Sequence, residues 1–193
     1  MLKDDTLIWN KVRECVDGHR PCALAIVIEA VGSTPQRIGA KLLLEGGSTL
    51  GTVGGGMVEA QTVEVARVCV NKSVSCIFTP RTSEKDEKYP LRCGGRMSIL
   101  IDGCLERHSH IIGMLTKVIE SRGKGFLIVR MSVEDGELLN HDWMFVALRG
   151  DNFADVSGEG IPTQLLTTLA YKRPCKPILK RFGEREWIYA EPI

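Results

Sequence analysis

Apolar residues follow helical and strand periodicities in turn along the first half of the chain. An amphipathic stretch predicts a helix over residues 6–17, and the continuous apolar run Ala23–Ala30 predicts a buried strand. Lys41–Glu45 and Ser48–Val53 flank a Gly-Gly pair, which predicts a β-hairpin. Helical spacing resumes at Met57–Val70, directly after three consecutive glycines.

The remaining periodicity predicts helices and strands that continue to the C-terminus. The expected elements are a strand at 74–79, a polar loop at 80–91, strands at 96–102, 125–132, 143–149, 177–182 and 186–191, and helices at 109–122 and 160–171. Neighbouring strand pairs favour an α+β fold with a mixed or largely antiparallel sheet and flanking helices. We expect one domain over residues 1–193, with a weak internal boundary near Gly103 that leaves room for a C-terminal subdomain.

Composition narrows the function classes. Lys+Arg 25 against Asp+Glu 24 gives a net charge of +1, so nothing in the charge favours nucleic acid or an anionic membrane as partner. No apolar run approaches the ~20 residues of a membrane helix, and the N-terminus is not a signal peptide. The sequence contains 7 cysteines, an odd number, and no C-x-x-C pair, which predicts reduced thiols in a cytoplasmic protein.

Three glycine-marked segments at strand ends are the main candidates for chemistry: Gly32–Lys41 (GSTPQRIGAK), Gly51–Ala60 (GTVGGGMVEA) and Cys93–Arg96 (CGGR). Glycines before a helix expose backbone N–H groups at the positive end of the helix dipole, which predicts an anion site; a simple tight turn is the alternative. The spacing matches neither G-x-G-x-x-G nor a P-loop, so we expect no NAD, FAD or nucleoside triphosphate.

Several side chains of these segments suit a charged heterocyclic ligand. Glu59 either complements the helix dipole or accepts hydrogen bonds from N–H groups of a heterocycle. Arg37 and Lys41 either bind phosphate or are solvated, and Arg37 is favoured because a guanidinium binds phosphate through two hydrogen bonds.

Cys93 is the cysteine that lies outside any apolar pattern. Arg92 precedes it, and a glycine pair and Arg96 follow, so cationic groups and backbone N–H groups would stabilise a thiolate that ligates a soft metal or carries sulfur; a plain bend is the alternative. A second group of ligand-type residues comprises Cys104, Glu106, His108 and His110. Their spacing is not that of a zinc site, so a turn into the next helix is favoured.

The three segments resemble the N-terminal domain of the XdhC/CoxI family, accessory factors of molybdenum hydroxylases such as xanthine dehydrogenase. That family carries G-S-(S/T)-P-R-x-x-G-A-(K/R), G-T-(I/V)-G-G-G-C-x-E-A and C-G-G in this order. The resemblance extends over about residues 7–103, and the segment after Trp187 is similar to the closing strand of the family's first domain. Here Gln36 replaces an arginine, with Arg37 beside it, and Met57 replaces a cysteine.

The resemblance implies a cytoplasmic accessory factor or chaperone, not an enzyme, which binds the molybdenum cofactor as cargo. This cofactor is a pterin with a dithiolene and a phosphate, and the implied role is its protection, sulfuration or delivery. The implied partners are a molybdenum hydroxylase apo-enzyme, a cysteine desulfurase and a second copy of the chain. The implied cofactor-binding residues are Ser33, Arg37, Lys41, Gly54, Gly55, Gly56, Glu59, Cys93, Gly94, Gly95 and Arg96, with no resident metal ion.

Three functions stay open at this point. The first is delivery, which Met57 favours over sulfuration because a thioether forms no persulfide. The second is sulfur transfer with Cys93 as the catalytic residue, and the third is a regulatory subunit that has lost the pocket. Family members continue into a Rossmann domain with its own glycine fingerprint, whereas this sequence stops at Ile193 and contains no such fingerprint. We therefore expect this chain to be a stand-alone first domain.

Overall fold

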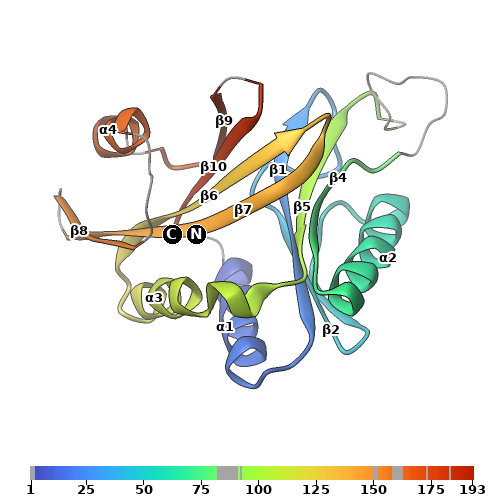
Figure 1. The fold of residues 1–193 in the computed structure, drawn as a ribbon, viewed down its shortest axis with the longest axis horizontal. Coiled ribbons are helices and arrows are strands. Elements are labelled where there is room, and N and C mark those ends of the chain that lie inside the picture. The colour runs from blue at the N-terminus through green and yellow to red at the C-terminus, as the bar shows by residue number, and fades with distance from the viewer. Residues whose placement is uncertain are drawn as a thin grey trace. The chain divides into compact units, whose positions relative to one another are not determined.

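The structure, a computed structural model, describes residues 3–81, 91, 93–149, 152–157, 163–172, 174–182 and 184–193. It divides into two compact units, residues 2–107 and 108–193. The described residues form two five-stranded antiparallel sheets and four α-helices (Figure 1), which confirms the predicted α+β class. The expectation of one domain over residues 1–193 stays a prediction.

The first unit contains an antiparallel sheet in the order β3-β2-β1-β5-β4. Each of its elements was predicted, with ends that shift by a few residues, while most of the polar loop at 80–91 lies outside the described residues. The elements are α1 (Lys3–Asp17), β1 (Cys22–Val31), β2 (Lys41–Glu45), β3 (Ser48–Gly51), α2 (Gly56–Lys72), β4 (Ser75–Phe78) and β5 (Arg96–Asp102).

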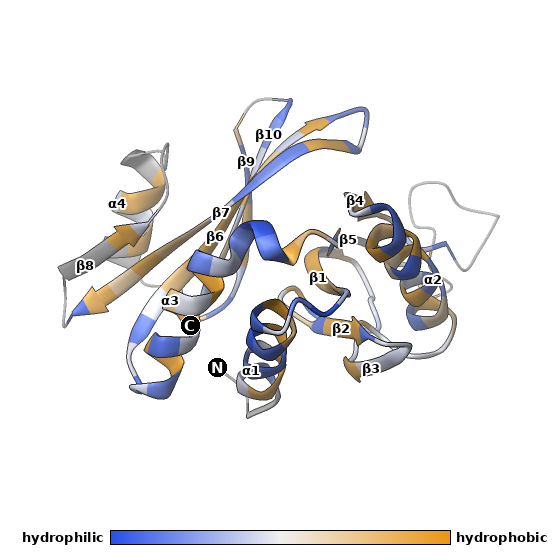
Figure 2. Ribbon diagram, turned by 60° about the horizontal axis from the view of Figure 1, so that its bottom comes forward, coloured by the Kyte–Doolittle hydropathy of each residue, from blue (hydrophilic) through white to orange (hydrophobic). Residues whose placement is uncertain are grey.

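The two helices of this unit pack on opposite faces of its sheet. One set of alternate strand residues, including Val27 and Leu42, packs with Val58 and Ala66 of α2. The other set includes Lys41, whose ammonium lies over the ring of Trp9 in α1. Both helices carry a hydrophobic and a hydrophilic face (Figure 2), and the central strand β1 is buried on both sides, which explains its continuous apolar sequence.

The strand order brings the three glycine-marked segments to one end of this sheet. Val31 at the end of β1 pairs with Arg96 at the start of β5. Gly32, which follows Val31, and Gly95, which precedes Arg96, therefore lie beside each other. Gly51 at the end of β3 pairs with Leu42 near the start of β2.

The second unit contains an antiparallel sheet in the order β8-β7-β6-β10-β9. Its elements are α3 (Ser109–Glu120), β6 (Lys124–Glu134), β7 (Glu137–Arg149), β8 (Asn152–Ser157), α4 (Thr163–Lys172), β9 (Ile178–Phe182) and β10 (Glu186–Pro192). Strand β10 lies between β6 and β9, which confirms that the C-terminal segment pairs into a sheet. The first residues of the helix expected at 160–171 lie outside the described residues.

Two features of this unit differ from the prediction. Strand β7 starts at Glu137 and not at 143, because Asp135 and Gly136 both have positive φ (49° and 83°) and form a two-residue hairpin turn after β6. Strand β8 was not predicted; its sequence NFADVS lacks a clear apolar alternation, and it forms by pairing with β7.

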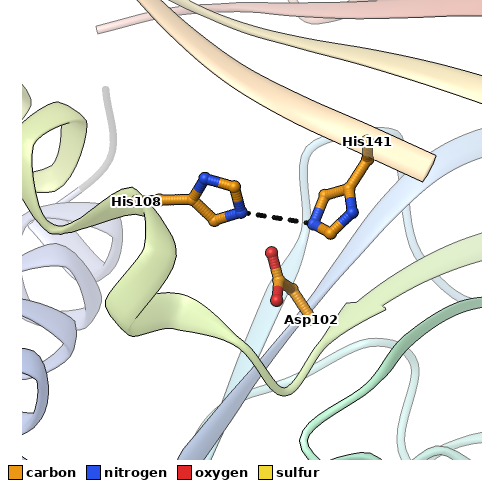
Figure 3. Close-up of side chains that lie close together, drawn as sticks. All are labelled: Asp102, His108 and His141. Carbon is orange, nitrogen blue, oxygen red and sulfur yellow. Dashed lines mark hydrogen bonds between the residues drawn. The ribbon is translucent and has the colours of Figure 1, made fainter.

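The sheet of the second unit also has a helix on each face. Phe126 and Val146 pack with Leu165 and Leu169 of α4 on one face. On the other face the ring of His108, just before α3, stacks on the ring of Trp143 at 4.8 Å between centroids. The Nε2 atoms of His108 and His141 lie 3.3 Å apart (Figure 3).

Candidate functional site

The three glycine-marked segments contact one another within the first unit. The Cys93 thiol donates a hydrogen bond to the Ser33 carbonyl oxygen, with 2.9 Å between the heavy atoms. Gly95 lies so close to Ser33 that an added Cβ would overlap the same carbonyl oxygen. A Cβ on Gly54 would lie 2.8 Å from Cγ of Pro35. The segments therefore pack so closely that there is no room for a side chain at Gly95 or Gly54, which explains why both positions are glycine.

Other glycines of the site leave the backbone open. Gly55, Gly56 and Gly94 have φ values of 66°, 52° and 82°, in the left-handed region that favours glycine. A Cβ added to any of the three would meet nothing within 4 Å. Gly55 also has ψ 178°, a combination that is essentially restricted to glycine. The backbone of the site therefore combines glycine-only conformations with room for an approaching ligand.

Helix α2 starts at this open backbone without a capping side chain. Its N-cap residue is Gly55, which makes no side-chain capping hydrogen bond, and the N–H of Glu59 donates to the Gly55 carbonyl at 3.2 Å. Thr52 Oγ1 donates to Glu59 Oε2 at 2.5 Å and accepts from the N–H of Gly54 at 3.2 Å. Thr52 thus fixes Glu59 beside the glycines. Thr52 was not among the predicted site residues, although it precedes the triple glycine by two residues.

Arg37 is the predicted cation that the structure leaves exposed. Among the described residues it has no carboxylate partner. The turn before it is internally bonded: Thr34 Oγ1 donates to the Gln36 carbonyl at 2.9 Å, and Gln36 Oε1 accepts from the N–H of Arg37 at 3.4 Å. Gln36, which stands where the family has arginine, therefore contributes to this turn.

The two other predicted cations have partners of their own. Lys41 is 2% exposed, and its Nζ lies 2.9 Å from the Gly39 carbonyl oxygen and 3.5 Å from Asp5 Oδ1. Arg96 Nη2 lies 3.3 Å from Glu29 Oε2 in an ion pair. These positions favour structural roles for both residues.

Cys93 and Met57 present the sulfur atoms at this end of the sheet. Cys93 is exposed, and Met57 is 52% exposed. All seven cysteines are free thiols, in agreement with the odd number and the absence of a C-x-x-C pair. Arg92, the other expected cationic neighbour, lies outside the described residues.

The ligand-type residues around His108 follow the favoured alternative. A short 3₁₀ turn, Leu105–His108, leads into α3, as predicted for a turn into the next helix. Glu106 Oε1 lies 3.2 Å from His19 Nδ1, and His110 Nδ1 lies 3.3 Å from Ser157 Oγ. The partner of His108 is His141, which the sequence analysis missed because it lies on another element 33 residues away.

Comparison with known proteins matches residues 15–79 to the XdhC and CoxI family. Residues 15–79 are therefore similar to a domain of the XdhC/CoxI family. The matched range includes the first two glycine-marked segments. The resemblance drawn from the motifs is confirmed for residues 15–79.

Two individual proteins are similar to this chain. YqeB of Escherichia coli strain K12 is 30% identical over 95 residues, which cover 49% of this chain and 18% of YqeB. The crystal structure of a Bacillus halodurans protein described as a xanthine dehydrogenase aligns with a TM-score of 0.65 at 16% identity. That alignment covers 94% of this chain and 51% of the Bacillus protein, so it supports the fold. This chain therefore spans about half or less of the length of these relatives. None of its described helices is long and apolar enough to cross a bilayer.

Proposed function

We propose that the first unit of this chain binds the molybdenum cofactor as cargo and delivers it to a molybdenum hydroxylase of the xanthine dehydrogenase type. One observation carries the proposal: three separate segments meet through Cys93–Ser33, Gly95–Ser33 and Gly54–Pro35 contacts, while the neighbouring glycines face open space. The similarity of residues 15–79 to the XdhC/CoxI family supports it.

The phosphate of the cofactor suits the start of α2. The backbone N–H groups of Gly55 and Gly56 lie at the positive end of the helix dipole, and no side-chain capping hydrogen bond is made at the N-cap residue Gly55. The N–H of Gly54 is already donated to Thr52. Arg37 adds a guanidinium that is exposed and has no carboxylate partner among the described residues. Lys41 and Arg96 act indirectly in this proposal, because Asp5 and Glu29 already neutralise them.

The pterin suits Glu59. A carboxylate accepts hydrogen bonds from ring N–H and amino groups, and Thr52 occupies Oε2 while no described residue bonds Oε1. The donor Thr52 is itself fixed by the N–H of Gly54. Glu59 is therefore oriented before the ligand arrives, which reduces the entropy lost on binding.

Cys93 suits the sulfur-rich end of the cofactor. Its thiol is exposed and is held at the junction of two segments by the Ser33 carbonyl. When bound, the cofactor supplies a molybdenum atom with a dithiolene, for which a thiol is a ligand of matching softness. The same exposed thiol favours a second candidate function, in which Cys93 accepts sulfur from a cysteine desulfurase as a persulfide. Mass spectrometry of Cys93 after incubation with desulfurase and cysteine tests it.

The delivery proposal is tested by retention of molybdenum. The full chain is incubated with molybdenum cofactor and passed through gel filtration, and molybdenum is measured in the protein peak, whose elution volume also reports any homodimer. We expect retention by the wild type and a loss of at least tenfold for Arg37→Gln and Glu59→Gln, since each removes about one charge-assisted hydrogen bond.

Arg67→Gln is the matched control. Arg67 is an exposed arginine of α2 that pairs with Glu64 at 2.8 Å, away from the glycines, so its replacement leaves retention unchanged. A wild-type chain that elutes without molybdenum would refute the proposal. Retention that falls equally in Arg67→Gln would show that only general charge attraction is involved.

A further inference from the structure

Two thiols lie together in the first unit, at the end of the sheet opposite the three glycine-marked segments. Cys69 belongs to the last turn of α2, and Cys76 belongs to β4. Their Sγ atoms are 3.7 Å apart and share a hydrogen bond. Cys76 pairs in register with Ile101 near the end of β5, whereas the Cys93–Arg96 segment lies at the start of β5.

The geometry favours a bond between these sulfurs. A disulfide needs the sulfurs at about 2 Å, so side-chain rotation and a small backbone shift must close the gap. Strand β4 is an edge strand of the described sheet, and its residues are half-buried. Cys69 is 2% exposed, so a reagent in solution meets Cys76 first.

The two thiols are also chemically different. The hydrogen bond that Cys76 shares with Cys69 lowers the pKa of Cys76 against the opposing effect of burial. The same hydrogen bond, together with burial, raises the pKa of Cys69. Cys76 is therefore the thiol that attacks, and Cys69 is the thiol that reacts second.

A second pair with the same spacing provides an internal comparison. Cys15 near the end of α1 and Cys22 at the start of β1 are also seven residues apart and also interact. Burial raises the pKa of Cys15, and burial raises the pKa of Cys22 to about 12. Both are buried, so neither supplies an accessible thiolate.

We propose that Cys69 and Cys76 form a redox-active dithiol that closes to an intramolecular disulfide on reaction with a low-molecular-weight disulfide. The Cys76 thiolate attacks one sulfur of the reagent, which forms a mixed disulfide and releases one thiolate. Cys69 then loses its proton to solvent and attacks Cys76 Sγ, which releases the second. Two protein thiols are oxidised and one reagent disulfide is reduced to two thiols. The product joins α2 covalently to β4, and this proposal is independent of cofactor binding.

The test uses oxidised glutathione on the full-length chain. Free thiols are then alkylated in denaturant, and the protein is digested with trypsin without reduction. Cleavage after Arg67, Lys72 and Arg81 places the two cysteines on different peptides, 68–72 and 73–81. We expect these two peptides to appear joined by a disulfide, Cys93 and Cys175 to carry glutathione, and Cys15 and Cys22 to be alkylated.

Variants identify the order of the steps. Cys69→Ala should leave glutathione on Cys76, because the second thiol is missing, and Cys76→Ser should leave Cys69 alkylated. Cys175→Ser is the control, since it removes an exposed cysteine of the second unit and should leave the joined peptides unchanged. Recovery of alkylated Cys69 and Cys76 from wild-type protein in which Cys93 carries glutathione would overturn the proposal. Equal oxidation of Cys15 and Cys22 would overturn the chemical distinction between the pairs.

Discussion

The substitution Gly95→Ala tests whether close packing of two backbone segments builds the candidate site. The new Cβ would overlap the Ser33 carbonyl oxygen and lie 2.9 Å from Thr34 Cγ2. Both segments must move apart, at a cost of about 1–3 kcal/mol for overpacking. Separation also breaks the hydrogen bond from Cys93 to the Ser33 carbonyl, which contributes about 1 kcal/mol. We expect the free energy of unfolding of the first unit to fall by about 2–4 kcal/mol.

The matched control for this prediction is Gly94→Ala, one residue earlier. Its Cβ meets nothing within 4 Å, so the cost comes from the φ of 82° alone and is about 1–2 kcal/mol. Hydrogen exchange at increasing urea, measured on peptides from residues 2–107, separates the first unit from the second. An equal or smaller loss for Gly95→Ala than for Gly94→Ala would refute the packing argument.

Three further predictions address the same chain. Cys93→Ser should fold with an unchanged circular dichroism spectrum but lose molybdenum retention or activation of the hydroxylase; equal retention and activation would remove Cys93 from the site. Gly55→Val should abolish molybdenum retention and lower the free energy of unfolding in urea by about 1–3 kcal/mol, because φ 66° and ψ 178° suit only glycine. A destabilised variant that still retains molybdenum would show that these glycines serve only the turn. Removal of residues 186–193 deletes the strand between β6 and β9 and the fully buried Ile188. The melting temperature of the second unit should therefore fall by more than about ten degrees, on the order expected for a loss of several kcal/mol. An unchanged melting temperature would contradict the assigned topology.

Local sequence patterns predicted most of the first unit. Gly46-Gly47 between two apolar runs specified the β2–β3 hairpin, and both glycines have positive φ. The apolar residues of Met57–Val70 specified α2 because they keep helical spacing and no glycine or proline interrupts them. The second unit shows the limit of that reasoning. The Asp135-Gly136 pair is a strong hairpin signal that was overlooked, so the first part of β7 was missed.

Side-chain partnerships were harder to predict than elements, because they depend on register. Arg96 meets Glu29 because a register shift in the β1–β5 pairing brings Glu29 opposite Ser98, two pairs away from Arg96 on the same face of the sheet. Trp187 is half-buried, and the guanidinium of Arg181 lies 4.3 Å from the centre of its ring. Glu29 and Arg181 lie on other strands than their partners, and no spacing rule within one segment identifies them.

Lys41 shows how register changes the interpretation of a motif. In the sequence it ends a glycine-marked segment and adds positive charge beside Arg37. In the structure it is the first residue of β2, and strand alternation directs it to the face that α1 covers, where Trp9 and Asp5 surround its ammonium. An ammonium held there stabilises the α1–β2 packing and contributes little to a ligand at the strand ends. Anion recognition in the proposed site therefore depends on backbone N–H groups and on Arg37. Because backbone groups persist when side chains change, Arg37→Gln should weaken the binding of a phosphate-bearing ligand without abolishing it, whereas Gly55→Val should abolish it.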